Sequence, residues 1–172
     1  VNYDRVRDRP ERTGLDMLNW FSQSPQSDSV VITGASTGIG AACALALDKL
    51  GYRVFAGVRH SADGERLQQQ AGPRLMPIRL DVTDAASISA ATHTVAAMVG
   101  ERGLAGLVNN AGIGVAGPIE LLPLADWRRQ FEVNVFGLIA VTQTFLPLIR
   151  TGRGRIINMG SIAGRASMPF MA

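Results

Sequence analysis

Short apolar runs alternate with longer helical stretches from Ser29 to the end of the chain. The runs are apolar throughout, which is typical of strands buried on both faces of a parallel sheet. The predicted strands are Val30–Ile32, Arg53–Val58, Leu75–Leu80, Leu104–Val108 and Arg155–Met159. The predicted helices are Ile39–Leu50, Asp63–Gln70, Asp84–Val99 and Leu124–Ile149. Right-handed crossovers then favour an α/β fold: a doubly wound parallel sheet, Rossmann-like, in three α/β/α layers with strand order 3-2-1-4-5.

The first strand runs into a glycine-rich turn, Thr33-Gly34-Ala35-Ser36-Thr37-Gly38-Ile39-Gly40, which opens a helix. Gly34 allows a tight turn, Gly38 lets the backbone approach a phosphate, and Gly40 allows close packing of helix on strand. A pyrophosphate would bind at the helix N-terminus, where free N–H groups favour anions. The context of strand, turn and helix predicts a nucleotide site, and the alternative is a glycine-rich turn without a ligand.

The composition excludes several classes of protein. One cysteine, Cys43, excludes a disulfide scaffold and a cysteine-based zinc site, and with only two histidines we expect no metal. Seventeen Lys and Arg against fourteen Asp and Glu are mixed along the chain, so the net charge of +3 does not predict nucleic-acid binding.

The chain divides into a polar extension over residues 1–28 and a nucleotide-binding domain over residues 29–172. The extension is interpreted either as a partner-binding arm or as a loose segment. It lacks the apolar core of a secretory signal, and we find no run of about 20 apolar residues to span a membrane. We therefore expect a cytoplasmic protein with no membrane span.

Four motifs in order give a resemblance to a known family. They are the G-x-x-x-G-x-G turn, Asn109-Asn110-Ala111-Gly112, Asn134, and Asn158-Met159-Gly160-Ser161. Together they resemble the short-chain dehydrogenase/reductase family, from about Ser29 to Ala172. The resemblance implies hydride transfer between NADP(H), or alternatively NAD(H), and a small secondary alcohol or ketone. It implies these cofactor-binding residues: Gly34, Ser36, Thr37, Gly38, Ile39, Gly40, Arg59, Asp81, Val82, Asn110, Ala111 and Gly112.

The end of the second predicted strand bears on the choice of cofactor. A carboxylate there would bind the ribose hydroxyls of NAD, but Val58 occupies that position and Arg59 follows. An Arg can bind a 2′-phosphate, so NADP(H) is favoured, although Thr37 in the glycine-rich turn is not basic. By resemblance, Asp81 and Val82 meet the adenine, and the alternative is that Asp81 caps a turn.

The resemblance assigns catalytic roles to Asn134, which would keep a water for proton relay, and to Ser161, which would bind the substrate oxygen. The alternatives are a structural amide for Asn134 and a turn residue for Ser161. The family's Tyr-x-x-x-Lys motif does not occur: Tyr3 and Tyr52 are the two tyrosines, and Lys49 is the one lysine. Counting from Ser161 puts the motif just past Ala172, with the family's last strands. We therefore expect the chain alone to be inactive.

Two other interpretations stay open. The chain could be a non-catalytic nucleotide-binding module, or a fragment prone to misfolding because its last strand and long helix are left uncovered. Relatives often dimerise through the long helix, so a homo-oligomer is expected.

Overall fold

The computed structural model describes residues 27–164 and Ala166; the polar extension, apart from Ser27 and Asp28, and the Met168–Met171 segment lie outside them. The described residues form a parallel sheet with strand order β3-β2-β1-β4-β5, which confirms the predicted topology. The strands are β1 (Ser29–Ile32), β2 (Arg53–Val58), β3 (Leu75–Arg79), β4 (Gly106–Asn109) and β5 (Arg155–Asn158). Each lies within two residues of its predicted bounds.

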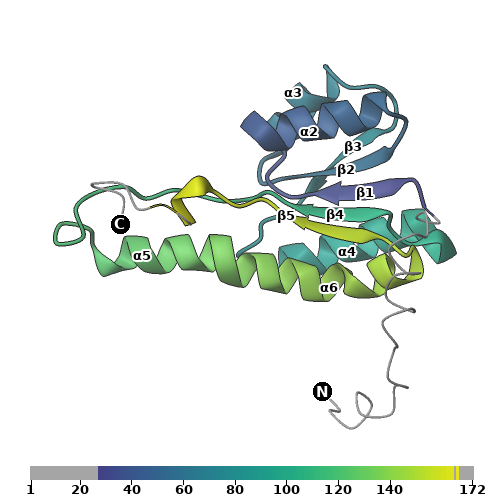
Figure 1. Cartoon of the computed structure of the whole chain (residues 1–172). Helices are drawn as coiled ribbons and strands as arrows, with labels where there is room; N and C mark the ends of the chain where they lie inside the picture. Colours follow the sequence, from purple (N-terminus) through teal and green to yellow (C-terminus); the bar gives the residue numbers. More distant parts are fainter. Residues whose placement is uncertain (1–26, 165, 167–172) are drawn as a thin grey trace, which may run out of the picture.

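Helices cover both faces of the sheet, which gives the three predicted layers (Figure 1). On one side lie α2 (Gly38–Lys49) and α3 (Ser61–Gln68), and on the other α4 (Ala85–Val99) and α6 (Leu138–Thr151). The first side packs a core that includes Val54, Ala56 and Leu67. The second packs a larger core around Phe55 and Phe145. The alternation of β2 side chains between these cores follows from the two-residue period of a strand.

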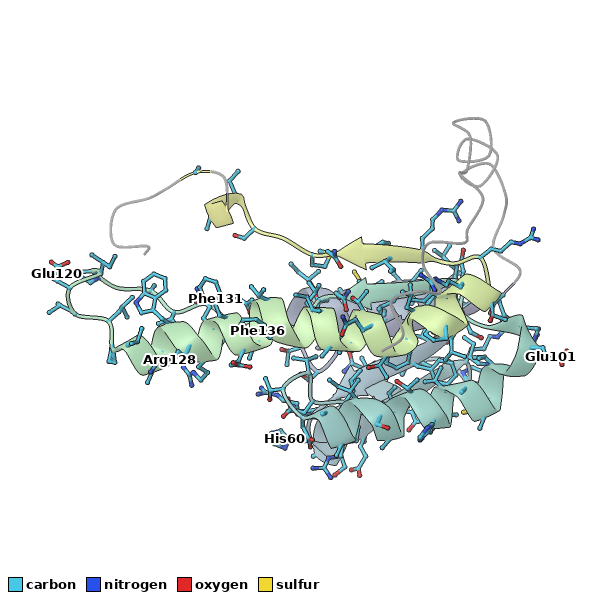
Figure 2. All side chains as sticks on the ribbon, turned by 90° about the horizontal axis from the view of Figure 1, so that it is seen from below. His60, Glu101, Glu120, Arg128, Phe131 and Phe136 are labelled. Atoms are coloured by element: carbon cyan, nitrogen blue, oxygen red, sulfur yellow. The ribbon has the colours of Figure 1, made fainter. Side chains whose placement is uncertain are left out.

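The predicted helix Leu124–Ile149 is continuous but not uniform. It consists of α5 (Leu124–Phe131), a π-helical turn η3 (Glu132–Gly137), and α6. A π-turn holds an extra residue, so side chains before and after it no longer share one face. The turn therefore interrupts the apolar repeat that runs from Trp127 to Phe145. Val141 and Phe145 are fully buried, whereas Phe131 is half exposed on the part that extends beyond the sheet (Figures 1 and 2).

The whole helix, Leu124–Thr151, is long and apolar enough to cross a membrane by length and composition. The prediction that the chain has no such stretch is therefore wrong on those two criteria. In the fold, Val141, Phe145 and Ile149 of this helix are buried against the sheet. Packing accounts for these three residues, but only 22% of the apolar window is buried, so most of its apolar surface lies open in the described fold.

Candidate functional site

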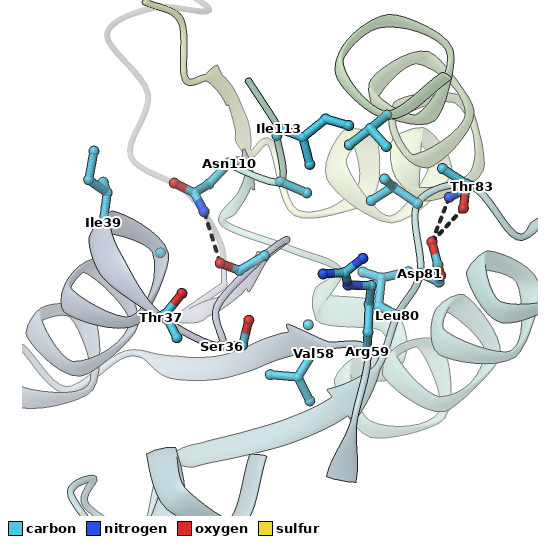
Figure 3. A pocket seen from close by; sticks show the side chains of 17 residues that line it. Ser36, Thr37, Ile39, Val58, Arg59, Leu80, Asp81, Thr83, Asn110 and Ile113 are labelled. Atoms are coloured by element: carbon cyan, nitrogen blue, oxygen red, sulfur yellow. Dashed lines mark hydrogen bonds between the residues drawn. The ribbon is translucent and has the colours of Figure 1, made fainter. Parts of the chain in front are cut away.

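A cleft of about 340 Å³ lies at the carboxyl ends of β1, β2, β3 and β4, where the strand order reverses (Figure 3). This is where doubly wound sheets bind ligands. All the predicted cofactor residues line it except Gly38, which lies in the same turn. The lining also includes Gly57, Val58, Leu80, Thr83, Ile113 and Val133, which sequence analysis did not assign to the cofactor. Leu80, Thr83 and Ile113 adjoin predicted residues, which was the available signal for them.

The glycine-rich turn packs closely against the backbone at the end of β4. Gly34 has a φ of +65°, and a Cβ atom there would lie 2.7 Å from the Cα of Ala111. A Cβ on Gly40 would collide with the carbonyl oxygen of Gly34 and the side-chain nitrogen of Asn110. The first N–H groups of α2, which begins in this turn, have no acceptor within the helix and remain available to a ligand.

Thr33 and Asn110 join the turn to the end of β4. The buried hydroxyl of Thr33 accepts hydrogen bonds from the backbone nitrogens of Asn110 and Ala111, both at 3.0 Å. The side-chain nitrogen of Asn110 donates to the carbonyl oxygens of Thr33 and Gly34, also at 3.0 Å. Figure 3 shows the bond to Gly34. Four bonds therefore fix two cleft walls that lie far apart in sequence. Sequence analysis missed Thr33, since a threonine at a strand end shows no distinctive pattern.

Asp81 shapes the opposite wall. Its Oδ1 accepts hydrogen bonds from the backbone nitrogen of Thr83 at 2.9 Å and from the Thr83 hydroxyl at 2.7 Å. Partial burial alone would raise the pKa of Asp81, but these two bonds and the charges of Arg59 and Arg79 bring the pKa below its usual value. The carboxylate is thus held ionised. Asp81 thus caps the turn that leads into α4, which agrees with the alternative given by the sequence, while the N-cap of α4 itself is Asp84, whose Oδ1 accepts from Ala86 N.

Arg59 follows the buried end of β2 and points into the cleft in Figure 3. Within the described residues its guanidinium forms no hydrogen bond or close ion pair, although its charge acts on Asp81. Val58 beside it is buried and uncharged. The cleft therefore presents a cation, and no carboxylate, at the end of β2.

Asn134 and Ser161 do not line this cleft. The side chain of Asn134 accepts a hydrogen bond from Ile113 N at 2.9 Å and donates one to Ile113 O at 2.8 Å, so both ends of its amide are engaged. One helical turn earlier, Gln130 accepts from Val115 N at 2.6 Å. The two amides hold the loop after β4. Sequence analysis missed Gln130, because nothing local links it to a loop fifteen residues earlier.

Ser161 lies just after β5, as predicted from its position, and is exposed. Its hydroxyl accepts a hydrogen bond from Ala163 N at 3.2 Å, within the short helix η4 (Ile162–Gly164). This is the arrangement of a turn serine.

Asn109 links the ends of β4 and β5. Its side-chain nitrogen donates to Asn158 Oδ1 and to Thr142 Oγ1, both at 2.9 Å. These two bonds give Asn109 a structural role at the end of β4. Its own Oδ1 is buried without a hydrogen-bond partner.

The chemistry of the cleft suits an extended, phosphate-containing ligand. It offers free N–H groups at a helix N-terminus, a cation at Arg59 and an ionised carboxylate at Asp81. Within residues 27–164 and 166, no three His, Cys, Asp or Glu side chains lie close enough to hold a metal ion.

The chain is similar to known proteins of one family. Residues 28–172 match the family model described as short chain dehydrogenase. Among curated proteins, bovine (Bos taurus) dehydrogenase/reductase SDR family member 9 is 45% identical over 137 residues, which are 79% of this chain and 43% of that protein. Human (Homo sapiens) 17-beta-hydroxysteroid dehydrogenase type 2 is 41% identical over 84% of this chain and 38% of that protein. Mouse (Mus musculus) retinol dehydrogenase 5 is 43% identical over 82% of this chain and 45% of that protein. The chain spans less than half the length of these relatives.

Solved structures share the fold. A 3-ketoacyl-(acyl-carrier-protein) reductase from Brucella melitensis, complexed with NADH, superposes with a TM-score of 0.77 at 28% identity, covering 83% of this chain and 61% of that one. A short-chain dehydrogenase from Burkholderia cenocepacia in complex with NADP gives a TM-score of 0.74 at 31% identity, covering 87% of this chain and 60% of that one.

Proposed function

Because the chain belongs to the short-chain dehydrogenase family, we propose that it is the cofactor-binding part of a nicotinamide-dependent oxidoreductase. The parent protein would interconvert a secondary alcohol and a ketone. The observation that carries the proposal is the cleft at the switch point, with the glycine-rich turn on one side and Asp81 on the other.

The residues present fit a dinucleotide. The close approach of Gly34 to Ala111 leaves room where a side chain would block the turn, and α2 presents its N-terminus there. The backbone of Gly34–Gly40 would bind the pyrophosphate, and Asp81 with Val82 would meet the adenine. When bound, the cofactor supplies or accepts the hydride at its nicotinamide ring. Gln130 and Asn134 would position the loop after β4 along the nicotinamide side.

NADP(H) is the proposed cofactor, with NAD(H) as the alternative. The uncharged Val58 and the cationic Arg59 at the end of β2 support a 2′-phosphate at this point. Solved relatives bound to NADH and to NADP show that the family's fold accommodates both.

Direct binding tests this. Titration of the 172-residue chain with NADPH and with NADH, followed by nicotinamide fluorescence, should give saturable binding that is tighter for NADPH. Nicotinamide mononucleotide lacks the adenosine half and should bind much more weakly. If neither dinucleotide binds saturably, the cleft is not a cofactor site.

We further propose that these 172 residues alone do not turn over, since they contain no Tyr-x-x-x-Lys to handle the hydroxyl proton. Incubation with NADP⁺ or NAD⁺ and secondary alcohols should give no reduced cofactor; dehydrogenase rates of ordinary size would contradict this.

The lack of a Tyr-x-x-x-Lys motif in these residues also favours a second candidate, a non-catalytic nucleotide-binding module. The reading frame after Ala172 separates the two: a Tyr-x-x-x-Lys there supports the enzyme, and a stop codon supports the module.

Relatives named for a hydroxysteroid and for retinol support an apolar alcohol as the parent's substrate.

We also propose that the chain assembles with a second copy of itself. Phe136 and Ile139 of the long helix are 55% and 44% exposed, and Ile156 and Ile157 of β5 are 38% and 53% exposed. A second copy of the chain would cover the helix. Light scattering of wild type and Phe136→Asp tests this, because the charge should reduce the mass of the associated species.

A further inference from the structure

A second cavity, of about 700 Å³, borders the cofactor cleft at the end of β2. It lies between α3 and the edge strand β3, and Val58 and Arg59 line both hollows. The charged side chains that line it are Arg59, Arg79 and Glu65. The sequence analysis gave Arg79 no role.

Register places Arg79 beside Val58. The two residues are direct partners in the parallel ladder between β2 and β3. A Cβ on Gly64 of α3 would lie 3.3 Å from Val58 Cγ2 and 2.7 Å from Pro77 Cβ, so Val58 and Pro77 face α3. Because side chains alternate along a strand, Arg79, two residues after Pro77, faces α3 as well. Its guanidinium therefore shares a sheet face with Val58, where a carboxylate would meet the ribose hydroxyls of NAD.

The residues that line the second cavity carry a net positive charge. Arg59 and Arg79 both act electrostatically on Asp81, so both lie within reach of the adenine side of the cleft. Arg79 is exposed and has no hydrogen bond or close ion pair within the described residues. Glu65 is the one carboxylate among the residues lining the second cavity, since the nearby Asp63 pairs with Arg66. The lining of the second cavity therefore holds two guanidiniums and one carboxylate, while the ionised Asp81 belongs to the adjoining cofactor cleft.

We propose that Arg79 is a second specificity-determining residue, which together with Arg59 binds the 2′-phosphate of NADP(H) from the side of α3. This inference rests on the proposed function, because it assumes that the adenosine half of a dinucleotide occupies the cleft. Two guanidiniums on neighbouring strands can bind different oxygens of one phosphate, which a single arginine cannot do as completely. Such a pair also explains how a 2′-phosphate could be selected without a basic residue at Thr37.

The test compares two fragments of the cofactor that differ only in the phosphate at issue. The 172-residue chain is titrated with 2′,5′-ADP and with 5′-ADP by calorimetry. Wild type should bind 2′,5′-ADP more tightly. Arg79→Gln should weaken binding of 2′,5′-ADP about tenfold, as expected for a charge-assisted hydrogen bond, and change binding of 5′-ADP less than about twofold. Arg79→Lys keeps the charge and should give an intermediate loss.

Two matched variants separate a local contact from general charge. Arg128→Gln removes an exposed arginine of α5 that lines neither cavity, and it should leave both affinities unchanged. Glu65→Gln removes the opposing carboxylate and should tighten binding of 2′,5′-ADP. The melting temperature of each variant is measured alongside.

The outcomes are distinguishable. If wild type binds 5′-ADP but shows no preference for 2′,5′-ADP, or if Arg79→Gln keeps the preference, the role of Arg79 is overturned while the cofactor cleft stands. If wild type binds neither nucleotide, the proposed function and this inference fail together.

Discussion

The side-chain amide of Asn134 forms two hydrogen bonds with the backbone of Ile113, one through each end of the amide, at 2.9 and 2.8 Å. The pairing joins the π-helical turn of the long helix to the loop that leaves β4 along the cleft. Replacing this side chain should therefore affect both stability and the order of that loop.

Asn134→Ala should lower the free energy of unfolding by about 2 kcal/mol, because two partly buried backbone groups lose their partners. Hydrogen exchange at the amide of Ile113 should accelerate. Gln143→Ala, which removes an exposed amide from α6, is the control and should change stability by less than about 0.5 kcal/mol. Unchanged exchange at Ile113 would show that the loop is held by other contacts.

Thr33→Val tests the link between the glycine-rich turn and β4. Valine has nearly the shape of threonine, but the N–H groups of Asn110 and Ala111 would lose their acceptor inside the protein. We expect a loss of about 2 kcal/mol in urea unfolding and weaker binding of NADPH. Thr33→Ser retains the hydroxyl and should keep most of both. Equal stability of the two variants would contradict this account.

Gly40→Ala should destabilise the protein, although alanine favours helices over glycine by about 1 kcal/mol. The added methyl group would collide with the carbonyl of Gly34 and the amide of Asn110. Overpacking of this kind costs about 1–3 kcal/mol. Gly114→Ala, where a Cβ meets no atom within 4 Å, is the matched control for thermal melts. A gain in stability for Gly40→Ala would show that the two backbones can separate.

Asp81 predicts a specific dependence of stability on pH. Its pKa is lower in the folded protein than the value of about 3.9 in an unfolded chain, so the ionised group stabilises the fold above that value. This contribution is lost as pH falls through the folded pKa, since the unfolded state then binds the proton first. The side chain is partly exposed, so the contribution should stay below about 1 kcal/mol.

The measurement is the difference in unfolding free energy between wild type and Asp81→Asn. It should be largest above pH ~5 and approach zero in stronger acid, where the carboxyl is protonated and resembles an amide. A difference that is independent of pH would mean that the charge of Asp81 does not contribute.

The fold and most of the cleft could be predicted from sequence because their signals are local. Apolar runs, helical stretches and the glycine-rich turn give the strand order, and the order places Asp81 and Asn110 at one sheet edge. Contacts that depend on packing could not be predicted. Thr33 and Gln130 accept hydrogen bonds from residues far away in sequence, and Arg79 lies beside Val58 only through the register of the two strands.

Periodicity alone does not tell which apolar residues of the long helix are buried. A helical repeat from Trp127 to Phe145 predicts one buried stripe, but burial needs a surface to pack against. The sheet provides that surface for Phe145 and not for Phe131. The sequence also predicted that the long helix would be left uncovered, and the exposed Phe136 and Ile139 agree with this, but the tertiary structure was needed to tell which residues lie on the uncovered face.

The π-turn at Glu132–Gly137 lets the long helix hold the loop after β4 with Gln130 and also pack Phe145 into the core. Each residue of an α-helix advances about 100° around the axis, so a regular α-helix over the same residues would turn Gln130 by about that angle away from its present direction relative to Val141 and Phe145. The extra residue held in the π-turn absorbs this rotation. Deleting one residue of the turn other than Asn134 should therefore leave a regular α-helix in which Gln130 still holds the loop and Phe145 still packs in the core.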